Sequence, residues 1–249
     1  MYHQIAPEAP AAFRKYNVTP GDFRRQMGWL RRSGYNAVSM DDLAAARQGS
    51  SELPPRAIVI TFDDGFEACI QHAVPILQEF GFTAIFYLVA GLIGRESAWL
   101  QAERGCSFPL ADWTSVRELM AAGFQCGAHT MSHPRLTQLP SNECLAELRK
   151  GKRLLEDSLG TAIRHFAYPF GDYDARVRGL AREAGFETAC SVQIGLSEPN
   201  DDLMALHRVP INGSEGLLDF TSRVRTAHSI GERFWDKARA LRRRLTPAR

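Results

Sequence analysis

The sequence predicts an α/β protein built on a parallel sheet, either open or closed into a barrel. Short apolar segments typical of strands alternate with amphipathic helical segments along most of the chain. One of them, AIVITF at residues 57–62, is a continuous apolar and β-branched run of the kind found in strands buried on both faces. A length of 249 residues suits a single core. In such folds, function is expected at the carboxyl ends of the strands.

The first helix has a clear start. Thr19 is the expected N-cap and Pro20 occupies the first helical position, where its missing N–H costs nothing. The helix then runs to about residue 33, and Gly34 ends it. A short strand is expected at 36–38, followed by a helix to about residue 48 that Ser39 caps.

The remaining elements continue the alternation. Further helices are expected at residues 68–80, 114–122, 141–159 and 174–184. Further strands are expected at residues 83–89, 124–128, 164–167, 187–191 and 206–211. The stretch between the strand at 83–89 and residue 112 follows no regular pattern, and the chain contains no internal repeat or long linker.

Composition and charge favour an ordinary globular protein. Hydrophobic residues make up 45% and charged residues 23%, which argues against disorder and against a fibrous class. The formal net charge of +2 is too small to indicate a polyanion partner, so nucleic acid is not expected. The five cysteines are scattered without a C-x-x-C pair, which suggests reduced thiols in a cytoplasmic protein.

The two ends of the chain bear on its location. No apolar run approaches the ~20 residues that span a bilayer, and the N-terminus lacks the pattern of a signal peptide. The chain is therefore expected to be cytoplasmic, and exported only if a leader has been removed. Residues 231–249 are expected to form a basic helix or tail after the domain at 1–230. It is interpreted either as a peripheral membrane contact or as a solvated helix, and nothing indicates an oligomeric state.

Two adjacent carboxylates, Asp63 and Asp64, follow the apolar segment 57–62 directly. Like charges in a confined site resist joint ionisation, and a metal ion removes that difficulty. The alternative is an Asp-Gly turn with two solvated carboxylates.

His129 and His133 follow the expected strand 124–128. Their spacing places two imidazoles on one side of a helical turn or tight loop, as a shared divalent ion requires. Surface or capping histidines are the alternative. With one of the two aspartates they make a three-ligand set that leaves a coordination position open for water.

These motifs, TFDDG and then H-T-x-x-H, resemble those of the polysaccharide deacetylases of carbohydrate esterase family 4, the NodB-homology domain. Residues 166–173 are similar to the third motif loop of that family, and the likeness covers roughly residues 56–211. It implies a distorted (β/α) barrel with parallel strands and fewer than eight complete units. It also implies one divalent metal ion, Zn²⁺ first with Ni²⁺, Co²⁺ or Mn²⁺ as alternatives, held by Asp64, His129 and His133.

The N-terminal segment M-Y-H-Q-I resembles a narrower group, the circularly permuted deacetylases of poly-N-acetylglucosamine. In that group the motif carrying the catalytic acid lies on the first strand, and His3 is the matching residue. An incidental histidine near a frayed end is the alternative for His3. His207 is the fallback acid.

Two features depart from the family pattern. Ala167 stands where the third motif usually carries an arginine that tethers the base aspartate. Arg208 is a candidate for that charge, and a surface ion pair is its alternative role. The aspartate-tryptophan pair of the fourth motif is missing after Gly171, and Asp112 with its tryptophan neighbour is interpreted as a helix N-cap.

The resemblance implies a hydrolase that removes N-acetyl groups from an amino sugar in a glycan. Asp63 would take a proton from the attacking water and His3 would protonate the leaving amine, while the metal polarises the carbonyl. The residues expected to bind substrate or stabilise the oxyanion are Tyr168, Pro169, Phe170, Gly171 and Arg208. The alternatives are a deacetylase or deformylase of a lipid-linked sugar at the membrane face, and a carbohydrate-binding pseudoenzyme.

Overall fold

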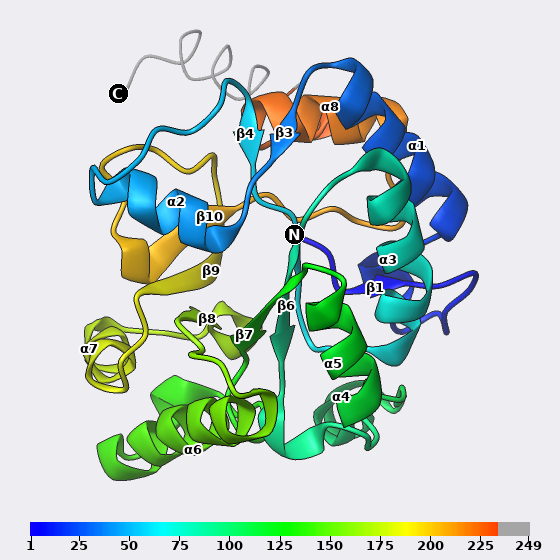
Figure 1. The fold of residues 1–249 in the computed structure, drawn as a ribbon. Helices are drawn as coiled ribbons and strands as arrows, with labels where there is room; N and C mark the ends of the chain where they lie inside the picture. Colours follow the sequence, from blue (N-terminus) through cyan, green and yellow to red (C-terminus); the bar gives the residue numbers. More distant parts are fainter. Residues whose placement is uncertain (234–249) are drawn as a thin grey trace, which may run out of the picture.

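Six parallel strands form the centre of the protein in the computed structural model, which describes residues 1–233, and the helices lie around them (Figure 1). Their order in the sheet is β10-β9-β8-β7-β6-β5, so each strand except the two edges pairs with its neighbours in sequence. The six strands are β5 (Thr61–Phe62), β6 (Ile85–Leu88), β7 (Gln125–Ala128), β8 (His165–Ala167), β9 (Thr188–Ile194) and β10 (Leu206–Arg208). The expected parallel α/β class is confirmed.

The first residues of the chain lie between the two edges of this sheet. The N–H of Tyr2 donates to the carbonyl of Thr61 over 2.8 Å, and the N–H of Asp63 donates to the carbonyl of Tyr2 over 3.0 Å. On the other side, the N–H of Ile211, just after β10, donates to the carbonyl of Met1 over 3.0 Å. The N-terminal segment therefore joins the β5 edge to the chain that leaves β10, and it places the third residue at the carboxyl edge of the sheet.

Four of the helices begin at a residue whose side chain caps the first turn. Thr19, Ser39, Asp112 and Asp174 each accept a hydrogen bond from a backbone N–H in the first turn, and Ser39 forms a full capping box. Two helices, α4 (Ala98–Arg104) and α8 (Leu217–Thr226), lie in segments for which no element was predicted. The helices are α1 (Pro20–Arg32), α2 (Met40–Arg47), α3 (Glu67–Phe80), α4 (Ala98–Arg104), α5 (Trp113–Ala121), α6 (Ser141–Leu159), α7 (Ala175–Glu183) and α8 (Leu217–Thr226).

The expectation of one strand over residues 57–62 was wrong. The segment makes two short strands, β4 (Ala57–Ile58), which pairs with β3 (Asn36–Ala37), and β5, which pairs with β6. Residues 57–59 are only half-buried. An apolar β-branched run shows that a strand is favoured, but it does not mark the residue at which the partner strand changes. A further pair, β1 (Gln4–Ile5) with β2 (Asn17–Val18), was also not predicted.

Aromatic side chains fill the core beside β5 and β6. The rings of Phe62 and Phe86 stack with centroids 4.6 Å apart, and Tyr2 stacks on Phe62 at 5.4 Å. All three are buried, and the hydroxyl of Tyr2 donates to Gln26 over 2.8 Å. Tyr2 is thus a core residue.

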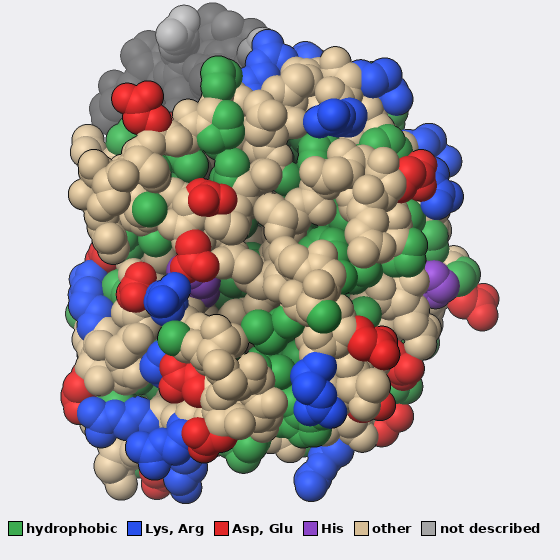
Figure 2. Space-filling view, in the orientation of Figure 1, with side chains coloured by type: hydrophobic (Ala, Val, Ile, Leu, Met, Phe, Trp, Pro, Cys, Tyr) green, Lys and Arg blue, Asp and Glu red, His purple; other side chains and the backbone are tan. Residues whose placement is uncertain are grey.

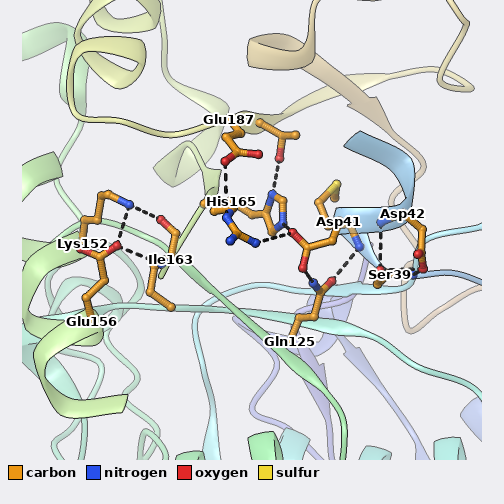
Figure 3. Close-up of polar contacts among 12 residues, drawn as sticks. Ser39, Asp41, Asp42, Gln125, Lys152, Glu156, Ile163, His165 and Glu187 are labelled. Carbon is orange, nitrogen blue, oxygen red and sulfur yellow. Dashed lines mark hydrogen bonds and ion pairs between the residues drawn. The ribbon is translucent and has the colours of Figure 1, made fainter. Parts of the chain in front are cut away.

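A polar cluster at the amino ends of β7, β8 and β9 fixes α2 against the sheet (Figure 3). We call Asp41, Gln125, His165 and Thr188 the amino-end cluster. Nε2 of His165 donates to the Asp41 carboxylate over 2.9 Å, because a carboxylate only accepts, and Nδ1 then accepts from the Thr188 hydroxyl over 3.0 Å. Gln125 donates to the same carboxylate over 2.6 Å. Burial lowers the pKa of His165, and Asp41 offsets this only in part.

On the face shown in Figure 2, basic and acidic side chains are interspersed. The five cysteines have free thiols, as expected from their spacing. Within residues 1–233, no helix has both the length and the apolar character needed to cross a membrane. Residues 234–249 lie outside the described residues, so the basic C-terminal helix or tail and the domain division after residue 230 stay predictions.

Candidate active site

The structure brings Asp64, His129 and His133 together at the carboxyl ends of the strands. Asp64 follows β5, whereas His129 and His133 lie in the loop after β7. Nε2 of His129 is 3.5 Å from Oδ1 of Asp64, and Nε2 of His133 is 3.3 Å from the same oxygen. One ligand atom from each residue lies within 4.8 Å of the others, and all three residues are buried.

These distances suit metal ligands better than hydrogen bonds. N–H···O bonds are mostly about 2.7–3.2 Å long. Metal bonds of about 2.0–2.1 Å at tetrahedral angles instead place ligand atoms roughly 3.4 Å apart. Nδ1 of His129 lies 2.7 Å from the carbonyl oxygen of Ala167, which only accepts, so Nδ1 carries a proton and Nε2 is the nitrogen that faces Asp64. The three side chains therefore fit a divalent cation.

The charge states of Asp64 and His133 are those that a metal needs. Burial by itself would raise the pKa of Asp64, but the adjacent imidazoles of His129 and His133 outweigh it and hold that pKa well below its ordinary value. Burial lowers the pKa of His133, against the opposing effect of Asp64. An ionised carboxylate beside neutral imidazoles is the form in which these groups bind a metal.

Two aromatic rings hold the ring of His133. Trp99, on α4, stacks on it with centroids 4.4 Å apart and an interplanar angle of 23°. Phe170 meets it edge-on at 4.5 Å. The Nδ1 atom of His133 is buried and has no hydrogen-bond partner in the part of the chain that the structure describes. Trp99 was missed from the sequence, because its segment shows no regular pattern.

Backbone strain concentrates at this site. Of the six non-glycine residues with positive φ in the described chain, four lie here: Asp64 (73°), Thr130 (67°), His133 (65°) and Phe170 (59°). Such conformations cost about 1–3 kcal/mol each, and most of all for a β-branched residue such as Thr130. Within the loop, the hydroxyl of Thr130 accepts from the N–H of His133 over 2.9 Å. Spacing alone did not reveal this conformation.

Arg208 forms a bidentate ion pair with Asp63. Its two terminal nitrogens donate to the two carboxylate oxygens over 2.6 and 2.7 Å, and its Nε donates to the carbonyl of Ser191 over 2.8 Å. Burial would raise the pKa of Asp63, but the Arg208 guanidinium outweighs it and keeps that pKa below its ordinary value. Arg208 thus supplies the charge that Ala167 cannot supply. Its expected role in substrate binding was wrong, because its nitrogens are committed to protein groups, and so was the alternative of a surface pair.

Of the two candidate acids, His3 lines a cleft that Asp63 and Asp64 also line, and His207 does not. The ring of His3 packs against Tyr16 with centroids 5.0 Å apart. Burial lowers its pKa, whereas Asp64 and Asp63 raise it.

Neighbouring residues of a strand point to opposite faces, so His207 faces away from its neighbour Arg208 and from the site. Its Nε2 lies 3.1 Å from the side-chain oxygen of Gln193, and it lines a separate cavity. The structure therefore does not bring the fallback acid to the cleft.

The third motif loop forms one wall of this cleft, whose volume is about 460 Å³. Phe170 is half-buried, and the guanidinium of Arg135 lies over its ring at 4.1 Å. Gly171 has φ of 66°, and a Cβ there would lie 2.1 Å from a methyl group of Val192, so only glycine fits. Tyr168 is buried with its hydroxyl bonded to a backbone carbonyl over 2.9 Å. In this loop, Phe170 is better placed than Tyr168 to meet a ligand.

Comparison with known proteins agrees with this geometry. The family model described as "Polysaccharide deacetylase" matches residues 50–189. The poly-beta-1,6-N-acetyl-D-glucosamine N-deacetylase of Escherichia coli (strain K12) is 26% identical, over 90% of this chain and 38% of that protein. The chain thus spans well under half the length of this curated relative.

Two solved structures show the same fold. The Streptococcus pyogenes deacetylase PplD, in complex with acetate, superposes with a TM-score of 0.77 at 21% identity, over 89% of this chain and 95% of that one. IcaB from Ammonifex degensii also gives 0.77, at 24% identity, over 91% and 94%. The expected distorted (β/α) barrel is confirmed.

Proposed function

This chain belongs to the polysaccharide deacetylase family, and from that premise we propose that it removes N-acetyl groups from a polymer of N-acetylated amino sugar with one divalent metal ion. The observation that carries the proposal is the convergence of three ligand atoms beside Asp63, on an open cleft. The E. coli relative is named for poly-β-1,6-N-acetylglucosamine, which makes that class of polymer the first substrate to test.

Asp64, His129 and His133 would hold the metal. One carboxylate and two imidazoles favour Zn²⁺, with Ni²⁺, Co²⁺ or Mn²⁺ as alternatives. When bound, such an ion polarises the amide carbonyl and lowers the pKa of water. The remaining groups of the mechanism belong to the protein.

Asp63 is the base in this proposal. It lies next to Asp64 in sequence, lines the cleft, and is kept ionised by Arg208. Each carboxylate oxygen has two acceptor positions, so the bonds from Arg208 leave room for a water molecule. Asp63 accepts the proton of that water as it attacks the acetyl carbonyl carbon.

The carbonyl oxygen gains negative charge as water adds, and in this proposal a backbone N–H of the segment Pro169-Phe170-Gly171 stabilises it. Pro169 has no N–H, and the N–H of Gly171 donates to the carbonyl of Tyr168 over 2.8 Å. That leaves the N–H of Phe170 in this loop. His3 then protonates the amine nitrogen as the C–N bond breaks, because expulsion of an amine anion is prohibitive.

Metal analysis and acetate release test this proposal together. The wild type is expected to bind one equivalent of Zn²⁺ and to release acetate from N-acetylglucosamine oligomers, and His129→Ala is expected to lose both properties. His207→Ala is the matched control, since it removes the same side chain from a position outside the cleft. Its metal content and activity should equal those of the wild type.

Three outcomes would change the proposal. A wild type that binds no divalent ion removes the metal centre. Tight oligomer binding without acetate release favours a carbohydrate-binding pseudoenzyme. Activity on an N-acetylated glycolipid but not on free oligomers favours the lipid-linked substrate.

A further inference from the structure

Glu147, on α6, contacts the loop between the two histidines. Its carboxylate accepts from the N–H of Met131 over 3.1 Å, from the N–H of Ser132 over 2.9 Å and from the hydroxyl of Ser132 over 2.9 Å. Glu147 is half-buried, and none of the ion pairs found within residues 1–233 includes it. Its hydrogen bonds in the described structure all go to this loop.

The surface of α6 is shaped to receive the loop. Gly151 lies one helical turn beyond Glu147, on the same face of the helix. A Cβ at Gly151 would lie 2.8 Å from the carbonyl carbon of Thr130 and 2.9 Å from its oxygen, so a larger residue would push the loop away. The N–H groups of Ala90 and Gly91 also donate to the carbonyls of Thr130 and Met131 over 3.0 and 2.9 Å. The loop is therefore fixed by two separate parts of the chain.

This fixation acts on the part of the chain that sets the position of His133. Thr130 and His133 both have left-handed backbone conformations, which persist only where the surroundings hold them. The two N–H groups that Glu147 binds belong to the two residues between them. Because Nδ1 of His133 has no hydrogen-bond partner among the described residues, ring packing and this backbone are what orient the imidazole.

We infer that Glu147 is a positioning residue, which holds the loop so that the imidazole of His133 lies at ligand distance from Asp64 before a metal binds. The inference rests on the proposed function, because it assigns Glu147 a role in building the metal centre. Glu147 does not line the cleft, and the hydrogen bonds that the structure describes for its side chain go to Met131 and Ser132 and not to the three ligands.

Zn²⁺ affinity, measured by competition with a chromophoric chelator, tests the inference without reference to turnover. Loss of a group that orients a metal ligand typically lowers affinity about 10–100-fold. Glu147→Ala is expected to fall in that range. Glu147→Gln keeps the volume and one acceptor oxygen, so its loss should be smaller. The Co²⁺-substituted Glu147→Ala protein should also show a changed visible absorption spectrum, because the ligand geometry is altered.

Glu156→Ala is the matched control. Glu156 lies on the same helix and is also half-buried, and it accepts from the N–H of Ile163 over 3.0 Å and from Lys152 over 2.8 Å (Figure 3). Glu156 therefore also accepts a hydrogen bond from the backbone of a loop, but this loop is not the one that carries His129 and His133. Its variant should lower thermal stability but keep the Zn²⁺ affinity and the Co²⁺ spectrum of the wild type.

A folded Glu147→Ala protein with wild-type affinity and spectrum overturns the inference, as does an equal loss of affinity in Glu156→Ala. If Glu147→Ala does not fold, Glu147→Gln decides: wild-type affinity and spectrum overturn the inference, and a reduced affinity with an altered spectrum supports it. His129→Ala separates the two proposals. If it binds Zn²⁺ as tightly as the wild type, the metal centre itself is wrong. If it loses Zn²⁺ while the Glu147 variants do not, only the role of Glu147 is wrong.

Discussion

Two clusters of histidine and aspartate lie at opposite ends of the same sheet, and they differ in where their polar atoms point. In the amino-end cluster, both ring nitrogens of His165 lie at hydrogen-bond distance from Thr188 and Asp41, at 3.0 and 2.9 Å. At the carboxyl end, His129 and His133 point their Nε2 atoms at one oxygen of Asp64 from 3.5 and 3.3 Å. Residue types are therefore a poor guide to function. Paired polar atoms mark a structural cluster, and convergence on a common point marks a binding site.

Backbone strain separates the two clusters as well. None of the four residues of the amino-end cluster has a positive φ, whereas Asp64, Thr130 and His133 all do. A structural cluster has no need of such conformations. A site that must hold several side chains at fixed distances often contains strained backbone conformations, and the surrounding contacts offset the cost of that strain.

Replacing one aspartate at each end of the sheet should give the largest difference in kcat. Asp63→Asn removes the proposed base, and general-base catalysis contributes about 10²–10⁴-fold, so kcat should fall by that amount while metal content stays unchanged. Asp41→Asn should leave kcat near the wild-type value, because the amino-end cluster lies at the other end of the strands. Acetate release from N-acetylglucosamine oligomers measures both. An active Asp63→Asn protein would remove the assigned base but not the metal centre.

Arg208→Ala should have the next largest effect, because it leaves the carboxylate of Asp63 buried without its partner. Breaking a buried ion pair costs about 3–5 kcal/mol of unfolding free energy, which urea denaturation measures. The pKa of Asp63 should rise, since burial then acts unopposed, so the acidic limb of the pH profile of kcat/KM should move to higher pH.

The exposed pair of Arg182 with Asp202 provides a control for Arg208. A terminal nitrogen of Arg182 lies 2.7 Å from the carboxylate of Asp202. Arg182→Ala should lower the unfolding free energy by only about 0–1 kcal/mol. Equal losses in the two variants would contradict the assignment of Arg208 as the tether of the base.

His165→Gln should have the smallest effect, about 1–2 kcal/mol from the loss of two hydrogen bonds. Because burial lowers the folded-state pKa of His165, the unfolded chain binds a proton first. The stability from His165 is therefore present above the unfolded pKa of about 6.5 and decreases as the pH falls through this value towards the folded pKa. Urea denaturation from pH 7.5 to 5.5 should show a weaker pH dependence in the variant. Changed Zn²⁺ affinity would show that the two clusters are coupled.

The sequence indicated the three proposed metal ligands because both motifs follow strands of one parallel sheet, and such strand ends meet. It also offered Arg208 as a replacement for the missing arginine, although only the structure shows the bidentate contact. Glu147 and Trp99 were not found, because their roles depend on tertiary contacts with the histidine loop and not on spacing. The division of residues 57–62 into two strands was missed for the same reason, since the partner strand changes within an unbroken apolar run.

The contact between Arg208 and Asp63 has a mechanical consequence. β10 and β5 are the two outer strands of the sheet and do not pair with each other, yet this ion pair connects one to the residue that follows the other. Any movement of these two strands away from each other would lengthen the ion pair. The pKa of Asp63 would then rise, because Arg208 lowers it, and the carboxylate would become a stronger proton acceptor. Deformation of the barrel and acid–base chemistry are therefore linked through a single pair of side chains, and heat or denaturant should alter reactivity before the fold is lost.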